Sequence, residues 1–189
     1  MFTLKNLKRF VLALKSLSNI KKKLKLKKLI SLNFQDRFKG KIVYLDHHLS
    51  HIASSSFFSD FDESVNLSID GFGDFASAGW GTLIDGKLSI DKKILFPHSM
   101  GIFYQAITQF LGFKNYGDEY KVMGMAGYGE EKYTKHLDKI VKLKNNGKFE
   151  IDNSYFNLYN KNFEFNWDGG TPTFNDLYNE DKFKQLLNL

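Results

Sequence analysis

The stretch that decides the fold is residues 64–95, SVNLSIDGFGDFASAGWGTLIDGKLSIDKKIL. At its start, Val65, Leu67 and Ile69 alternate with polar neighbours, a period of two that predicts a strand. We expect this strand to end in a glycine-rich, acidic turn, Asp70-Gly71-Phe72-Gly73-Asp74. The stretch therefore begins with a strand and a polar turn, as an antiparallel hairpin requires.

The remainder of the stretch predicts two further strands. One passes through Trp80, Thr82 and Ile84, and the next covers residues 87–95. Asp85-Gly86 between them is a strong signal for a two-residue hairpin. We therefore expect an antiparallel meander over about residues 65–95.

Upstream of the meander, residues 41–45 (KIVYL) predict a short strand that ends at Asp46. Asp46 can cap a helix over HHLSHIASSSFF, whose small residues 53–56 allow close packing. Downstream, Pro97 and Ser99 introduce a helix that Gly112 ends. Its expected buried stripe is Met100, Phe103, Ile107, Phe110 and Leu111.

The C-terminal third alternates helical and extended patterns. We expect a loop over 113–129, a charged surface helix over 130–144 and a turn at Asn145-Asn146-Gly147. An aromatic, strand-like segment over 149–166 and a last helix over 175–188 follow. The fold class is mixed α/β, with helices flanking the meander.

Composition excludes several kinds of protein. The chain has no Cys, so it holds neither a disulfide framework nor a thiolate metal site nor a Cys nucleophile. At 42% hydrophobic and 25% charged residues it is ordinary globular protein. No apolar run is long enough to cross a bilayer, and none near the start suits a secretory signal, so the cytoplasm is the default location.

Charge is unevenly distributed along the sequence. Residues 1–40 contain 12 Lys or Arg and one acid, a net charge of +11, whereas residues 41–189 have a net charge of −5. We treat 1–40 as a basic N-terminal segment and 41–189 as the body. The lysines at 21–28 suit a solvated, partly amphipathic helix, a phosphate or lipid-headgroup patch, or an organelle-targeting peptide. We expect this segment to be helical in part, weakly packed and exposed.

His47 and His51 lie four residues apart at the start of the expected helix, so their rings share one face. Two neutral imidazoles at that spacing can hold one metal ion. The alternative is a capping, hydrogen-bonded pair with a structural role.

The acidic turn after the first strand of the meander also has a chemical and a structural interpretation. Asp70, followed by Gly71 and Gly73, suits a metal ion beside a nucleotide phosphate, with Asp74 as a further candidate; a simple hairpin turn is the alternative.

In the glycine-rich run 117–129, Lys121 can neutralise phosphate or carbamoyl oxygens, and Glu119 can orient Lys121 or a substrate hydroxyl. The alternative is that this run is a glycine-rich connecting segment that holds an ion pair.

In their order, these pieces resemble the N-terminal domain of the NodU/CmcH-type carbamoyltransferases. The matching motifs are Asp46-His47-His48-Leu49-Ser50-His51-Ile52-Ala53-Ser54, Asp70-Gly71-Phe72-Gly73-Asp74, Pro97-His98-Ser99-Met100-Gly101-Ile102-Phe103-Tyr104, Gly112-Phe113-Lys114 and Glu119-Tyr120-Lys121-Val122-Met123-Gly124-Met125-Ala126. The resemblance covers about residues 43–130.

The resemblance implies a Kae1-like domain, related to the actin, sugar-kinase and Hsp70 proteins, with nucleotide bound between two lobes of RNase H-like topology. It implies a divalent metal, ferrous by preference, on His47, His51 and Asp70. Gly71, Gly73 and Asp74 would contact the ATP-derived carbamoyl-adenylate, and Glu119 and Lys121 would serve catalysis. The carbamoyl group, derived from carbamoyl phosphate, would pass to a hydroxyl of a small molecule.

Members of that family are longer than this chain. Residues 1–42 do not resemble their phosphate-binding hairpin, and the remaining lobe and a YrdC-like domain have no counterpart here. We therefore expect a fragment or a split member of the family, which needs those parts in trans or from a longer native gene and transfers no carbamoyl group alone. The alternatives are a non-catalytic metal- or nucleotide-binding module, and a nucleic-acid or membrane-surface binder using the basic segment; the acidic body argues against nucleic acid.

Overall fold

The computed structural model describes residues 25–26, 28–34, 37–158 and 175–189. The chain divides into two compact units, and the boundary between them along the sequence lies between Leu45 and Asp46. Within the part described, no helix is both long and apolar enough to cross a membrane.

In the first unit, residues 25–26 and 28–33 are helical, and the side chains of Lys25 and Lys28 are exposed. The expectation of an exposed, partly helical segment is confirmed for these residues, while the lysines at 21–23 and 27 lie outside the described residues. Residues 37–45 form neither helix nor strand, so the strand expected at 41–45 is wrong. A strand forms only where another strand completes its hydrogen bonds, and no described strand pairs with this segment.

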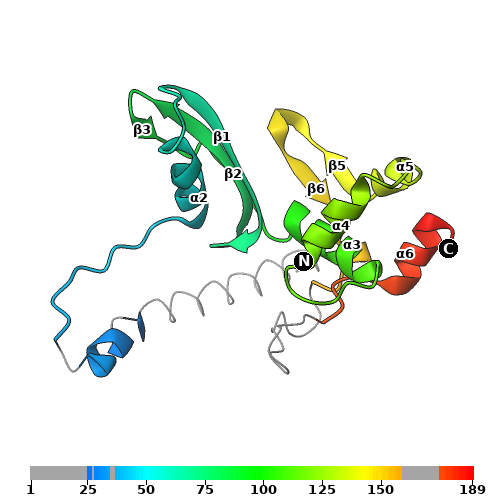
Figure 1. Cartoon of the computed structure of the whole chain (residues 1–189), viewed down its shortest axis with the longest axis horizontal. Helices are drawn as coiled ribbons and strands as arrows, with labels where there is room; N and C mark the ends of the chain where they lie inside the picture. Colours follow the sequence, from blue (N-terminus) through cyan, green and yellow to red (C-terminus); the bar gives the residue numbers. More distant parts are fainter. Residues whose placement is uncertain (1–24, 27, 35–36, 159–174) are drawn as a thin grey trace, which may run out of the picture. The chain divides into compact units, whose positions relative to one another are not determined.

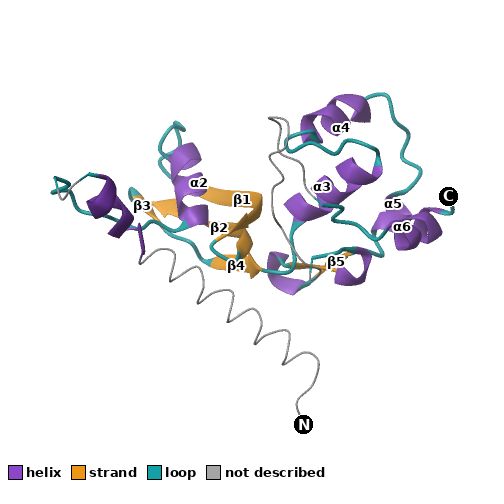
Figure 2. Ribbon diagram, turned by 90° about the horizontal axis from the view of Figure 1, so that it is seen from below, coloured by secondary structure: helices purple, strands orange, loops and turns teal. Residues whose placement is uncertain are grey.

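The second unit contains an antiparallel sheet (Figures 1 and 2). Its strands are β1 (Ser64–Gly73), β2 (Ala76–Ile84), β3 (Lys87–Leu88) and β4 (Lys92–Leu95). β2 pairs with β1 on one side and with β3 and β4 on the other. The expected meander is confirmed, although its third strand is divided. The Asp85-Gly86 hairpin is also confirmed, with φ of 51° and 69° at the two residues.

The first turn of the meander differs from the prediction. Residues 70–73 belong to β1, and the turn itself is Asp74-Phe75, with φ of 49° and 66°. Pairing runs regularly to Ile69 opposite Ala78 and resumes at Gly73 opposite Ala76. The residues between them form a bulge, because β1 has more residues there than β2 can pair.

Helix α2 (His47–Ser56) packs against β1 and β2. As predicted, Asp46 caps it, accepting a hydrogen bond from the Leu49 N–H at 3.0 Å. The strand residues that meet α2 are polar: Ser68 Oγ bonds His48 Nδ1 at 2.9 Å, and Ser56 Oγ donates to Asn66 Oδ1 at 2.6 Å.

The apolar alternate residues of β1 lie on its other face. The side chains of Val65, Leu67 and Ile69 are 82%, 63% and 55% exposed. Alternation along β1 is thus confirmed, but its polar residues are the buried ones.

The remainder of the unit packs around α3 (Met100–Phe110), which ends before Gly112 as predicted. With it are α4 (Glu119–Ala126), α5 (Thr134–Leu137), β5 (Val141–Leu143), β6 (Phe149–Ile151), the short 3-10 helices η1 (Asn145–Gly147) and η2 (Asn153–Tyr155), and α6 (Glu180–Leu187). The core comprises Ile102, Ala106, Ile140, Ile151, Phe156, Leu158, Leu177, Tyr178, Phe183 and Leu186.

Four of the five residues of the predicted α3 stripe pack against this core: Met100, Phe103, Ile107 and Phe110. Leu111 is 52% exposed instead, because it lies beyond the last turn of the helix.

Three boundaries in this part were predicted wrongly. The expected loop 113–129 contains α4. The expected helix 130–144 is only α5 followed by β5, because Val141, Lys142 and Leu143 pair with β6 through the predicted turn at 145–147. The last helix begins at Glu180, where the Asn179 side chain caps it by accepting from the Lys182 N–H at 3.1 Å. Of the strand-like segment 149–166, β6 is a strand, and residues 159–166 lie outside the described residues. The class is mixed α/β.

Candidate functional site

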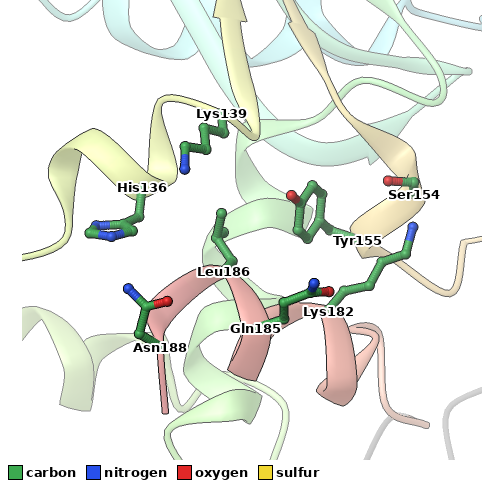
Figure 3. A pocket seen from close by; sticks show the side chains of 8 residues that line it. All are labelled: His136, Lys139, Ser154, Tyr155, Lys182, Gln185, Leu186 and Asn188. Carbon is green, nitrogen blue, oxygen red and sulfur yellow. The ribbon is translucent and has the colours of Figure 1, made fainter.

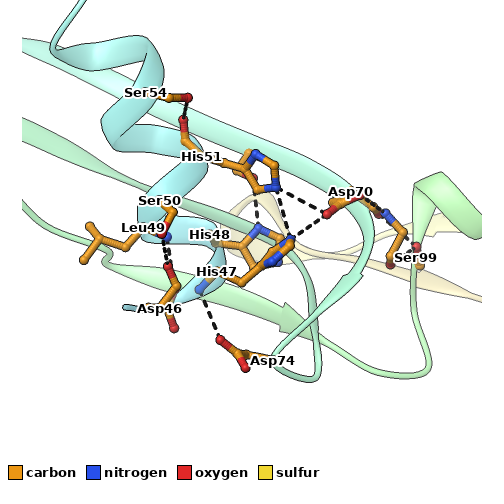
Figure 4. A network of polar contacts seen from close by, with 12 residues as sticks. Asp46, His47, His48, Leu49, Ser50, His51, Ser54, Asp70, Asp74 and Ser99 are labelled. Carbon is orange, nitrogen blue, oxygen red and sulfur yellow. Dashed lines mark hydrogen bonds and ion pairs between the residues drawn. The ribbon is translucent and has the colours of Figure 1, made fainter. Parts of the chain in front are cut away.

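The histidines of the candidate site lie on the first turns of α2, one helical turn apart (Figure 4). Three contacts fix this end of the helix. Asp46 caps it, and the same carboxylate pairs with Lys93 of β4. The His47 backbone N–H donates to the Asp74 carboxylate at 3.2 Å, which joins α2 to the first turn of the meander.

Asp70 follows Asn66 and Ser68 on the face of β1 that α2 covers, so its carboxylate lies beside these histidines. His47 Nε2 lies 2.6 Å from Asp70 Oδ2, and His51 Nε2 lies 3.5 Å from the same oxygen. The two imidazole Nε2 atoms are 3.1 Å apart. The ligand atoms of all three residues therefore lie within 4.8 Å of one another. The predicted convergence of His47, His51 and Asp70 is confirmed.

The environment of Asp70 favours its ionised form. Partial burial raises the pKa of this carboxyl. The hydrogen bond from His47, the hydrogen bond from the Gly71 N–H at 2.6 Å and the nearby imidazoles together lower it by more, so the pKa lies below its ordinary value. An ionised carboxylate next to two imidazoles is a suitable set of cation ligands.

Two close approaches of the backbone make this arrangement possible. A Cβ on Gly73 would overlap the ring of His47. A Cβ on Gly101, in the first turn of α3, would lie 2.6 Å from the backbone of Asp70 and Gly71. Ser99 also links the start of α3 to β1, because its hydroxyl donates to the Gly71 carbonyl at 2.7 Å and accepts from the Ile102 N–H at 3.1 Å. Helix α3 therefore rests directly on the strand segment that carries Asp70.

A cavity of about 750 Å³ adjoins His47 and Asp70. Its walls come from α2, β1, α3 and the segment leading into α4. The lining residues are His47, Ile69, Asp70, Gly71, Phe72, Gly101, Ile102, Tyr104, Gln105, Tyr116, Gly117 and Glu119. Two tyrosines, an amide and a carboxylate thus share one cavity with the candidate metal ligands.

The other predicted site residues divide into two groups. Gly71 and Glu119 line the cavity, whereas Gly73, Asp74 and Lys121 are absent from its lining. Gly73 leaves room for the His47 ring, and Asp74 anchors the start of α2.

Lys121 pairs with a carboxylate that the sequence did not single out. Its Nζ lies 2.6 Å from Asp118 Oδ1, and Asp118 is buried. The hydrogen bond from Lys121 holds the pKa of Asp118 below its ordinary value. The expected alternative, an ion pair in this segment, is therefore present, but its acid is Asp118 rather than Glu119.

The sequence reasoning also missed three lining residues, Tyr104, Gln105 and Tyr116. A signal for two of them was available, because Tyr104 and Gln105 follow Gly101 at positions i+3 and i+4 and so share its helix face. No local pattern marks Tyr116.

Comparison with known proteins gives this site a family. The family model for the carbamoyltransferase N-terminus matches residues 4–185, well beyond the motif-bearing stretch 43–130. The match therefore includes most of the N-terminal segment that we expected to fall outside the resemblance. The chain belongs to this carbamoyltransferase family.

The chain is similar to part of each of three longer relatives. It is 42% identical over 117 residues to the uncharacterised protein sll1178 of Synechocystis, covering 61% of this chain and 19% of that protein. It is 39% identical over 116 residues to the nodulation protein NolNO of Sinorhizobium fredii, covering 59% and 16%. It is 39% identical over 113 residues to the uncharacterised protein MJ1051 of Methanocaldococcus jannaschii, covering 59% and 22%. The matched stretch is about a fifth of the length of each relative.

Proposed function

We propose that this chain supplies the metal- and acceptor-binding part of an enzyme that transfers a carbamoyl group from carbamoyl-adenylate to a hydroxyl of a small molecule. The observation that carries the proposal is the convergence of His47, His51 and Asp70 at the edge of a cavity, in a chain that belongs to the carbamoyltransferase family. In the same proposal the domain is one part of a two-lobed, actin-like fold with ATP-derived nucleotide bound between the lobes.

The geometry of the three donors fits a single divalent ion. Ligands about 2.0–2.2 Å from one ion stand about 3.0–3.5 Å from one another in octahedral or tetrahedral geometry. The observed separations of 3.1 Å and 3.5 Å lie in this range, and the 2.6 Å separation needs only a small rotation of the carboxylate. Two imidazoles and one carboxylate are the donor set typical of ferrous iron.

A metal ion bound there would supply a positive charge beside the adenylate phosphate. The other tasks belong to the protein. In this proposal the Glu119 carboxylate and the Gln105 amide, which line the cavity, hold an acceptor hydroxyl, and the rings of Tyr104 and Tyr116 cover the body of the acceptor. Gly71, which has no side chain, allows a phosphate to approach the backbone of β1. Because Lys121 pairs with Asp118, we assign it to the positioning of the segment that carries Glu119.

Metal binding is testable without turnover. We expect residues 1–189 to bind one Co²⁺, used as a spectroscopic probe in place of Fe²⁺, with visible absorption bands of a nitrogen- and oxygen-ligated site. His47→Ala, His51→Ala and Asp70→Asn should each weaken binding at least about tenfold. His136→Gln and Asp62→Asn remove the same kinds of group elsewhere and should change affinity less than about twofold. Unchanged affinity in all three site variants would overturn the proposed metal site.

Transfer itself requires groups from outside this chain in our proposal. With carbamoyl phosphate, ATP, Fe²⁺ and candidate polyols, residues 1–189 should bind nucleotide weakly and produce no carbamoylated acceptor. Adding the C-terminal lobe and the YrdC-like domain of a relative in trans is expected to give AMP release and a mass gain on the acceptor. Robust carbamoylation by this chain alone would contradict the need for the added parts.

A further inference from the structure

A second cavity, of about 470 Å³, lies among α5, η2 and α6 (Figure 3). Its lining residues are His136, Lys139, Ser154, Tyr155, Lys182, Gln185, Leu186 and Asn188. None of them lines the cavity beside His47, so this is a separate site.

The lining has an unusual chemistry for this protein. The body of the chain, residues 41–189, has a net charge of −5, yet no carboxylate among the described residues lines this cavity. Lysine ammonium groups, amides, hydroxyls and an imidazole line it instead, and all of these can donate hydrogen bonds.

The two lysines that line the cavity, Lys139 and Lys182, are not neutralised by an ion pair within the part of the chain that the structure describes. Among the described residues, neither Lys139 nor Lys182 forms a salt bridge, whereas the neighbouring Lys184 pairs with Glu180 at 2.7 Å. Lys182 lies over the ring of Tyr155, with its Nζ 5.7 Å from the ring centroid. Asp152 interacts electrostatically with Lys182 but is outside the lining, and it accepts a hydrogen bond from the Ser154 N–H at 3.0 Å.

His136 provides an independent observation at the same place. Its Nδ1 is buried and has no hydrogen-bond partner in the described part of the chain. A buried polar atom of this kind normally has a partner, and one without a partner calls for an explanation. His136 lines the cavity, and a rotation of its ring would present this nitrogen to a bound ligand.

We propose that this cavity binds a small phosphorylated molecule. Lysine binds phosphate as a point charge, and Lys139 and Lys182 both line the cavity, on the two sides of Tyr155 and Leu186 in Figure 3. Gln185 and Asn188 can donate to the remaining phosphate oxygens. The side chain of Leu186 and the ring of Tyr155 supply an apolar surface for the body of the ligand. This site is independent of the proposed carbamoyl transfer.

The test is a titration of residues 1–189 with pyrophosphate in the presence of EDTA, followed by calorimetry and by amide chemical shifts. We expect saturable binding, with the largest shifts at Ser154, Gln185 and Asn188. The double variant Lys139→Met/Lys182→Met should weaken binding about a hundredfold, since each lost charge-assisted contact is worth about tenfold. The control Lys135→Met/Lys148→Met removes the same charge from exposed positions outside the lining and should weaken it less than about threefold.

Two results would overturn the proposal. One is equal weakening in the two double variants, which would indicate general attraction of anions to positive charge. The other is a wild-type titration without saturation or without shifts at the cavity residues; because it uses the unaltered chain, this readout holds even if the first double variant fails to fold.

Discussion

The contact between α3 and the strand that carries Asp70 can be tested with one methyl group. In Gly101→Ala, the new Cβ would lie 2.6 Å from the backbone of Asp70 and Gly71, against 3.4 Å for an ordinary contact, so helix and strand must separate by about 0.8 Å. Forcing an extra carbon into a packed contact costs about 1–3 kcal/mol, and backbone atoms cannot rotate away as a side chain can. Alanine in place of glycine in a helix recovers at most about 1 kcal/mol. Because the clash is with backbone, the cost lies in the upper part of that range, about 2–3 kcal/mol, and we expect a net loss of about 1–2 kcal/mol.

Gly124→Ala is the matched control. Gly124 is also a helical glycine, in α4, but a Cβ there meets no atom within 4 Å. Only the helix-propensity gain remains, so this variant should be more stable than the wild type by about 0.5–1 kcal/mol. Urea unfolding followed by circular dichroism measures both free energies. Gly101→Ala should also weaken Co²⁺ binding, because separating α3 from β1 displaces Asp70 from the histidines. A neutral or stabilising Gly101→Ala would refute the argument that α3 rests on Asp70-Gly71.

Three further outcomes follow from the packing and charges of the second unit. Ser99→Ala removes both the cap of α3 and the hydroxyl donated to β1, and should lower the free energy of unfolding by about 1–2 kcal/mol in urea titrations; an unchanged midpoint would contradict the double role of Ser99. Phe183 is fully buried in the core, so Phe183→Ala should lose about 3–5 kcal/mol, seen as a large fall in the thermal midpoint, and a loss below about 1 kcal/mol would contradict the described core. The pKa of Asp118 is lowered in the folded state, so its ion pair with Lys121 contributes stability at pH values above the ordinary carboxyl pKa of 3.8, and that contribution disappears as the pH falls through the lower folded value. Asp118→Asn should therefore weaken the dependence of the free energy of unfolding on pH below about 4. The same dependence on pH below about 4 in both proteins would count against this ion pair.

Local patterns in the sequence predicted the elements whose causes are local. Asp46 and Ser99 cap the helices that they were expected to cap, because a capping side chain bonds an amide only three residues away. Asp85-Gly86 forms its hairpin because these residues tolerate the left-handed backbone that such a turn needs. The spacing of His47 and His51 likewise placed their rings on one helix face before any tertiary contact was known.

Predictions failed where the deciding partner lay far along the chain. The strand expected at 41–45 has the right composition, but no described strand pairs with it. Residues 141–143 look like the end of a charged helix, yet they pair with β6, since sheet hydrogen bonds outweigh a weak helical preference. The alternation along β1 was visible in the sequence, but not which face α2 would cover, because either face satisfies a period of two.

The sequence by itself determined the ingredients of the site: two histidines at helical spacing, an aspartate beside flexible glycines, and a polar, glycine-rich segment downstream. The tertiary structure alone decided which of them meet. Asp70 reaches the histidines because it lies on the face of β1 that α2 covers and because α3 packs on that part of the strand through a glycine, Gly101, that lies far from both histidines in sequence. Lys121 bonds Asp118 rather than Glu119, since one turn of helix brings residues three apart together and leaves those two apart on different faces. Spacing along the chain fixes only short-range geometry, and the approach of distant segments depends on packing that no single segment encodes.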